Sequence, residues 1–210
     1  MAFSGFPEAA FDFYDDLEVD NSKSFWEAHK HVYLEAVKDP ITALVAALEP
    51  EFGPAKVFRP YRDVRFAKDK TAYKTHQGAY VEVRDSTGYY VQIGAPGVRV
   101  GVGFYWAEGE ALRAYRDAVA GPDGAELEKM VKRMTKAGWE LGGETLKTSP
   151  RGYPADHPRI DLLRHKALTF GKDYGFDTVV HTPELVDKVR QDWRKGRPFV
   201  EWALAHLHRG

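Results

Sequence analysis

Apolar side chains recur every three or four positions at the start of the chain, which is the spacing of one face of an α-helix. In the segment 7–19 this spacing leaves acidic residues on the opposite face. A second helix is predicted to start after Asn21 or Ser24, both good N-cap residue types, and to run to about Lys38. Asp-Pro at 39–40 should open a third helix, which Gly-Pro at 53–54 ends. The apolar positions of the first helix are Phe6, Ala10, Phe13, Tyr14 and Leu17.

The pattern after residue 55 changes to β-branched and aromatic residues, which is typical of β-strands. Four strands are predicted, over 57–66, 79–84, 89–93 and 98–106. Asp-Ser-Thr-Gly and Ala-Pro-Gly separate the last three strands and favour tight hairpin turns. Short links of this kind join antiparallel neighbours, so we expect an antiparallel meander of four or more strands over about 57–106.

Helical periodicity returns in the second half of the chain. The predicted order is helices, then strands, then helices, without the alternation that builds parallel sheets, so the fold class is α+β. We expect one domain over 1–210: helical over 1–55, a sheet over 56–106, and helical with a loop-rich insert over 107–210, with the helices packed on the apolar face of the sheet. The later helices are predicted at 108–120, 125–136, about 158–167, 183–195 and 198–207, with one more strand at 168–174.

Alternation along the predicted strands gives each one an apolar side and a side of Arg, Tyr, Gln and Gly. This second side has two interpretations. It is either the solvated face of an antiparallel sheet or a platform that binds a ligand. Solvation alone does not explain four tyrosines on that side, Tyr61, Tyr80, Tyr90 and Tyr105.

Composition narrows the class of protein. The net charge is −1, which argues against a surface built as a whole for nucleic acid, and the absence of cysteine excludes disulfides and thiolate sites. No apolar run reaches the ~20 residues of a membrane span, and the acidic start does not resemble a signal peptide, so a cytoplasmic protein is expected. The charge is unevenly distributed along the chain: the net charge is −8 over residues 1–55 and +5 over residues 56–76. Neighbouring segments of opposite charge are expected to neutralise each other in part within the fold.

The stretch RPYRDVRFAKDKTAYKTH, residues 59–76, holds most of the candidate chemistry. Its guanidinium groups suit carboxylate or phosphate, and its tyrosine rings can stack on a ligand or donate hydrogen bonds. Asp63 can orient Arg65 or accept a proton as a catalytic group. Strand alternation turns Arg62 toward the apolar face, so Arg62 and Phe66 are predicted to be structural. The candidate ligand-binding residues are Arg59, Tyr61, Arg65, Lys70, Tyr73 and Tyr105.

His157 is the other candidate for catalysis. It precedes Pro158 at a predicted helix start, where the positive helix end favours a neutral imidazole that could act as a general base. Capping of that helix by Asp156 or His157 explains the motif equally well. No spacing of histidines and acids is typical of a metal site, and Gly101-Val-Gly103 lacks the third glycine of a dinucleotide-binding loop. The sequence therefore predicts neither a metal nor a cofactor.

A long spaced motif carries a family resemblance. Arg-x-x-Arg-Asp-x-Arg-Phe at 59–66, followed by Asp69, Lys70 and Tyr73, resembles the signature of a bacterial family of conserved hypothetical proteins, the domain of unknown function 2461. The likeness extends to NSKSFWEAHK, GYYVQI, GVGFYW and PRGYPADHPRIDLLRHKAL. The resemblance implies a set of marker residues and no particular reaction.

Three functional hypotheses follow. The first is a site for a small anionic molecule on the Arg- and Tyr-rich face, with or without hydrolase or transferase chemistry. The second is a binding or regulatory module without catalysis. The third is contact with nucleic acid through 56–76, which the overall charge and the acidic neighbouring segment oppose. The sequence leaves the oligomeric state open.

Overall fold

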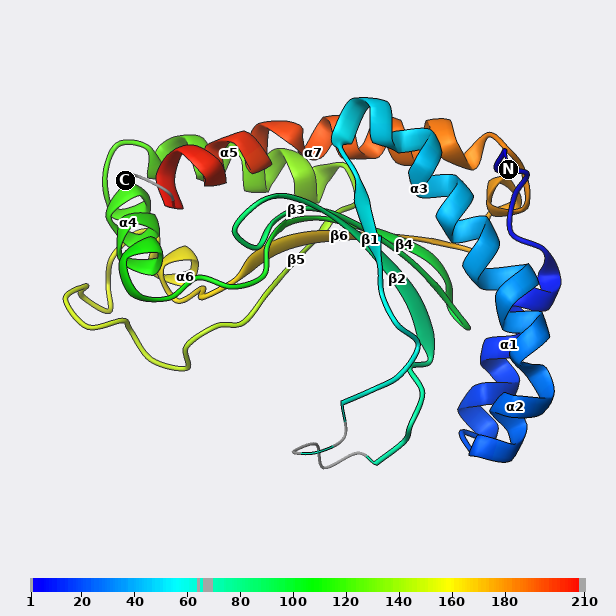
Figure 1. Cartoon of the computed structure of the whole chain (residues 1–210). Coiled ribbons are helices and arrows are strands. Elements are labelled where there is room, and N and C mark those ends of the chain that lie inside the picture. Colours follow the sequence, from blue (N-terminus) through cyan, green and yellow to red (C-terminus); the bar gives the residue numbers. More distant parts are fainter. Residues whose placement is uncertain (1, 64, 66–69, 208–210) are drawn as a thin grey trace. The chain divides into compact units, whose positions relative to one another are not determined.

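The structure of the chain, a computed structural model, describes residues 2–63, 65 and 70–207. Its helical segments are α1 (Glu8–Val19), α2 (Lys23–Val32), the π-helix η1 (Tyr33–Lys38), α3 (Asp39–Phe52), α4 (Gly109–Ala120), α5 (Gly124–Lys136), α6 (Ile160–Leu163), the 3-10 helix η2 (Thr178–His181) and α7 (Leu185–Leu207) (Figure 1). Its strands are β1 (Ala55–Val57), β2 (His76–Arg84), β3 (Thr87–Gly94), β4 (Gly97–Phe104), β5 (Glu140–Gly142) and β6 (Leu168–Gly175).

The fold is α+β, as the sequence predicts. The strands form one antiparallel sheet in the order β1-β2-β3-β4-β6-β5, so β2, β3 and β4 are the expected meander. Asp85 and Ser86 both have positive φ, which is the backbone of the tight hairpin turn expected between β2 and β3. No helix within the described residues combines the length and the apolar character that a membrane crossing requires.

The contacts of the chain divide it into two compact units. Unit 1 contains residues 1–81, 90–100 and 173–190, and unit 2 contains residues 82–89, 101–172 and 191–210. The expectation of one domain over residues 1–210 stays a prediction.

The N-terminal helices of unit 1 differ from the prediction in detail. The N-cap of α2 is Ser22, whose Oγ accepts a hydrogen bond from the Phe25 N–H at 3.1 Å, so neither Asn21 nor Ser24 caps this helix. The chain then stays helical through η1 into α3. Pro40 lacks an N–H, and in a regular α-helix its ring would collide with the carbonyl of Ala36. The wider π-helical turn directly before Pro40 accommodates it without a break.

The C-terminal segment is one helix, although two were predicted. Pro198 lies inside α7 instead of at the start of a new helix. In unit 2 the side chains of Trp193, Phe199 and Ala203 are fully buried, and the Phe199 ring meets the rings of Phe104 and Phe170. Burial of this face outweighs the local cost of the proline.

The first predicted strand, 57–66, is wrong over most of its length. β1 ends at Val57, where the Phe58 N–H still donates to the Gly78 carbonyl at 2.9 Å, and pairing resumes only at an isolated bridge between Tyr61 and Tyr73. Pro60 has no N–H to donate to a ladder, which is consistent with the interruption of pairing between Val57 and Tyr61. A long loop connects the end of β1 to the start of β2, and the structure describes its residues 58–63 and 70–75 (Figure 1). We call this loop the excursion and these two parts its branches.

The two-faced pattern predicted for the sheet also fails on β2. Residues 77–81 are buried on both sides of the strand, and Tyr80 is only 7% exposed. Val83 shares the side of Ala79 and Val81, which strand alternation predicts to be the apolar side, yet it is exposed. The candidate site therefore lies in the excursion between β1 and β2 and not on an open sheet face.

Candidate functional site

The two branches of the excursion come together at a pair of tyrosines. Tyr61 and Tyr73 form an isolated antiparallel bridge. The Arg62 N–H donates to the Ala72 carbonyl at 2.9 Å, and the Lys74 N–H donates to the Pro60 carbonyl at 2.8 Å. Between the Val57–Ala79 pair and this bridge, one branch has the three residues 58–60, while the opposite side has the five residues 74–78. The mismatch is a bulge, a feature that bends strands and redirects side chains.

Aromatic rings pack against this bridge. The buried Trp26 of α2 stacks on the Tyr73 ring, with the ring centroids 4.3 Å apart and the planes 10° from parallel. Tyr61 lies 5.9 Å from Trp26 and 5.5 Å from Tyr73 between ring centroids, yet remains 49% exposed. Tyr61 thus presents an aromatic surface to solvent on a rigid base.

Two side-chain amides fix the backbone of the excursion. Asn21 Nδ2 donates to the Tyr73 carbonyl at 3.1 Å, and Asn21 Oδ1 accepts from the Tyr73 N–H at 3.0 Å. The buried Gln77 accepts from the Tyr33 hydroxyl at 2.7 Å and donates to the carbonyls of Phe58 and Gly78 at 2.8 and 2.9 Å. Burial raises the pKa of Tyr33 to about 12, with a smaller contribution from Tyr61, so this hydroxyl stays a donor.

Four basic side chains gather around the bridge. Burial lowers the pKa of Lys74, and the nearby charges of Arg59 and Arg62 lower it further. The pKa of His76 is lowered by burial and then by Lys74 and Arg62. Among the described residues, Arg59, Lys74 and His76 make no side-chain hydrogen bond or ion pair, although the Lys74 ammonium lies 5.4 Å from the Phe58 ring centroid. We refer to Arg59, Arg62, Lys74 and His76 as the basic cluster.

The carboxylate of Asp63 is hydrogen-bonded to Arg65. Its carboxylate accepts from Arg65 Nε at 2.9 Å and from Arg65 Nη2 at 2.6 Å, and both side chains are largely exposed. These hydrogen bonds, followed by the charge of Arg59, lower the pKa of Asp63. A carboxylate with a lowered pKa is a weaker base, so this geometry favours the orienting role over proton transfer.

The family comparison agrees with the sequence resemblance. The model of one family, described as conserved hypothetical protein, matches residues 9–202. The chain belongs to the DUF2461 family. Comparison with curated proteins gives no match.

The remaining candidates of this DUF2461 protein are distributed over both units. Lys70 is exposed in unit 1, and Arg62 is half-buried and lies outside the strands. Tyr105 is 37% exposed and belongs to unit 2. Phe66 and the signature residue Asp69 lie outside the described residues. The roles assigned from the sequence to Arg62, Phe66, Lys70 and Tyr105 stay predictions.

His157 caps a turn in unit 2 of the DUF2461 protein. Its Nδ1 accepts a hydrogen bond from the Arg159 N–H at 3.0 Å, and its carbonyl accepts from the Ile160 N–H at 2.9 Å, directly before the short α6. An Nδ1 that accepts this bond carries no proton. The geometry matches the capping alternative, while a catalytic role for His157 stays a prediction.

The sequence interpretation did not single out Lys74, His76, Trp26, Asn21 or Gln77 as parts of the site. Lys74 and His76 stand in the same basic stretch as the predicted residues, so that stretch was the available signal. Asn21 is 52 residues from its hydrogen-bond partner Tyr73, and no local sequence pattern predicts a contact over such a separation.

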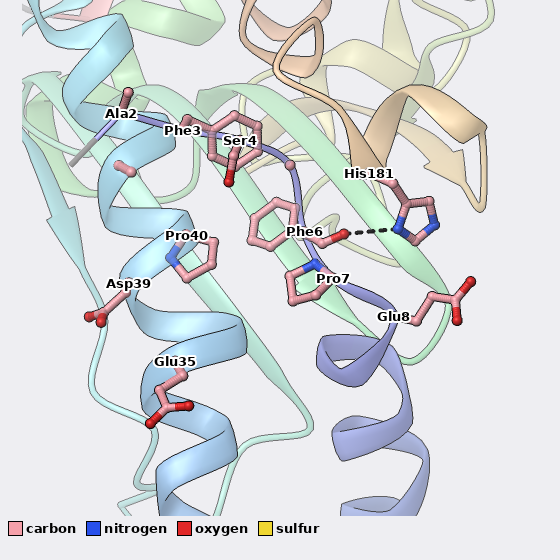
Figure 2. Close-up of a pocket in the computed structure, with 12 residues that line it drawn as sticks. Ala2, Phe3, Ser4, Phe6, Pro7, Glu8, Glu35, Asp39, Pro40 and His181 are labelled. Carbon is pink, nitrogen blue, oxygen red and sulfur yellow. Dashed lines mark hydrogen bonds between the residues drawn. The ribbon is translucent and has the colours of Figure 1, made fainter.

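A separate pocket in unit 1 is unsuited to an anion. Figure 2 shows the N-terminal segment beside α3, with the His181 ring close to Phe6. The pocket measures about 620 Å³ and has three carboxylates in its lining, Glu8, Glu35 and Asp39, but no lysine or arginine. Nδ1 of His181 donates to the Phe6 carbonyl at 2.8 Å. Among the described residues, no three His, Asp or Glu side chains are arranged to hold a metal ion.

The lowered pKa of His76 gives a testable prediction. The ordinary histidine value is about 6.5. Because His76 binds protons less readily in the folded protein, its contribution to the free energy of unfolding should decrease as pH falls below that value. An anion bound nearby favours the protonated ring, so added inorganic phosphate should raise the pKa of His76. Proton NMR titration of the ring measures this, and identical titration curves with and without phosphate would contradict it.

Gln77 gives a second prediction. Gln77→Ala should lower the free energy of unfolding by about 2 kcal/mol, because it leaves the buried Tyr33 hydroxyl and two backbone carbonyls with fewer partners. Urea denaturation measures the change. The matched control is Gln92→Ala, on a half-buried side chain that accepts one hydrogen bond from Tyr90. Equal losses at the two positions would contradict the special role of Gln77.

Proposed function

We propose that this protein binds a small anionic molecule, carrying phosphate or carboxylate, at the basic cluster. The observation that carries the proposal is that the Tyr61–Tyr73 bridge brings Arg59 and Arg62 of one branch near Lys74 of the other branch and His76 at the start of β2. Burial is the larger cause of the lowered pKa values of Lys74 and His76, and repulsion by the neighbouring positive charges lowers them further. A bound anion would replace this repulsion with charge-assisted hydrogen bonds.

The surroundings of the cluster suit a ligand with a flat group. Tyr61 offers an exposed ring beside the arginines, and an aromatic face can stack on a planar or cyclic group. Arg65, oriented by Asp63, and Lys70 are further cationic groups of the same excursion that we assign to the anion. The anchoring of Tyr73 by Asn21 and Trp26 supports the proposal, because pre-organised side chains lose less conformational entropy on binding.

We limit the proposal to binding. Both carboxylate oxygens of Asp63 are held by Arg65, and Nδ1 of His157 accepts a backbone hydrogen bond in unit 2. Neither arrangement favours proton transfer. Asp63 is therefore assigned to positioning of the Arg65 guanidinium.

A thermal-shift screen tests the proposal. The probes are inorganic phosphate, phosphate monoesters and small dicarboxylates, with chloride at equal ionic strength as the control. A ligand at 100 times its dissociation constant adds about 2.7 kcal/mol to the free energy of unfolding, which raises Tm by roughly 5 to 10 °C in a protein of this size. The absence of any stabilisation beyond that of chloride, across all three classes of anion, would contradict anion binding.

A further inference from the structure

A pocket of about 470 Å³ in unit 2 is lined by three arginines and a single carboxylate. Two of the arginines, Arg113 and Arg116, lie three positions apart on α4 and therefore share one helix face. The third, Arg151, comes from the loop that precedes α6. The lining carboxylate belongs to Asp117. The pocket is thus strongly basic, and its volume is within the range of small-molecule sites.

A tight turn brings Arg151 to the pocket. The Tyr153 N–H donates to the Pro150 carbonyl at 3.2 Å, which closes a turn with Gly152 in its third position at φ +92°. A positive φ at this place is the geometry that glycine adopts without strain. The Tyr153 hydroxyl donates to Asp117 Oδ1 at 2.8 Å and so ties the turn to α4.

Arg116 is held in position by the protein itself. Its Nε donates to the Leu163 carbonyl at 3.2 Å, and the neighbouring Tyr115 hydroxyl donates to the Leu162 carbonyl at 2.8 Å. These bonds connect α4 to α6 and fix the plane of the Arg116 guanidinium. Among the described residues, neither terminal nitrogen of Arg116 has a hydrogen-bond partner.

The charges of the other two arginines are not neutralised. Within the part of the chain that the structure describes, Arg113 and Arg151 make no side-chain hydrogen bond or ion pair. Asp117, which could pair with them, instead accepts the bond from Tyr153. The pocket also contains Gly109, the first residue of α4, and the N-cap residue Glu108 makes no capping bond with its side chain. The helix start offers backbone N–H groups to an anion, while the acids Glu108 and Glu110 at this helix start offset its partial positive charge, so the arginines supply the positive charge of the pocket.

We propose that this pocket is a second anion-binding site, which takes a compact oxyanion with two negative charges, such as a phosphate group or a dicarboxylate. Arg116 provides a fixed planar donor, while Arg113 and Arg151 close on the anion from α4 and from the turn. The site is in unit 2 and does not depend on the basic cluster of unit 1.

Amide NMR titration with two probes, inorganic phosphate and malonate, tests this inference. At least one of them should cause saturable shifts at Gly109, Leu112 and Gly152. Arg113→Ala and Arg151→Ala should each weaken the affinity measured at these amides at least tenfold, whereas Arg133→Ala, on an exposed arginine of α5 outside the pocket, should leave it unchanged. The two variants remove exposed side chains, and the remaining spectrum reports whether each one is folded.

Three results would overturn the second site. They are the absence of saturable shifts at the pocket amides with both probes, shifts confined to the amides of the excursion around Lys74 and His76, and an affinity at the pocket amides that neither arginine variant changes. Because the two sets of amides are read separately, failure of this site and failure of the proposed function are distinguishable. The probe that gives the stronger response shows whether the site prefers phosphate or dicarboxylate.

Discussion

Replacement of Trp26 by alanine is expected to lower the free energy of unfolding by about 3 to 5 kcal/mol. The side chain is 1% exposed and contacts the rings of Phe13, Tyr33 and Tyr73, so its removal leaves a large cavity below the excursion. Urea denaturation measures the loss. The stacked partner Tyr73 would lose its support, so the variant should also bind anions more weakly under conditions where it stays folded.

Trp106→Ala is the matched control for this prediction. Trp106 is 48% exposed, and its ring faces the Lys166 ammonium at 5.3 Å from the centroid. The expected loss is below about 1 kcal/mol, since little apolar surface returns to water. Equal losses in the two variants would contradict the account of Trp26 as the base of the site.

Loss of two neighbouring basic groups, one from each branch of the excursion, should have the largest effect on binding. We expect the double variant Arg59→Ala/Lys74→Ala to weaken phosphate binding about a hundredfold, or about 2.7 kcal/mol, because each residue contributes a charge-assisted hydrogen bond to the anion. Calorimetry measures the affinity. Lys30→Ala removes an exposed lysine of α2 and should leave it unchanged.

The stability of the same double variant distinguishes a binding site from a structural network. If the basic cluster repels itself in the free protein, removal of two of its charges should leave the free energy of unfolding within about 1 kcal/mol of the original value. A loss of several kcal/mol, with phosphate affinity unchanged, would instead assign these residues to internal ion pairs.

Local patterns were enough to predict most of the fold. The hairpin between β2 and β3 follows from Asp85 and Ser86, residue types that tolerate positive φ, and the strands of the meander follow from β-branched runs. The single helix α7 could not be predicted, because Pro198 is a local stop signal that buried contacts of Phe199 override. The π-helix before Pro40 could not be predicted either, because the chain there accommodates a proline within a continuous helix.

The candidate site was predictable only in its composition. The basic stretch identified Arg59 and Tyr61, but the assumed strand gave the wrong geometry, since regular pairing ends at Val57 and resumes only at the bulged Tyr61–Tyr73 bridge. The residues that build the site come from distant segments. Tyr33 meets Gln77 across 44 positions and Asn21 meets Tyr73 across 52, and such pairings depend on the folded backbone rather than on any local pattern.

The most direct test of anion binding at the basic cluster is an amide NMR titration of the unmodified protein with inorganic phosphate. We predict saturable shifts at the amides of Tyr61, Tyr73, Lys74 and His76, the residues that form and flank the bridge. A folded protein in which these four amides do not respond, at phosphate concentrations that stabilise it against heat, would contradict the proposed function.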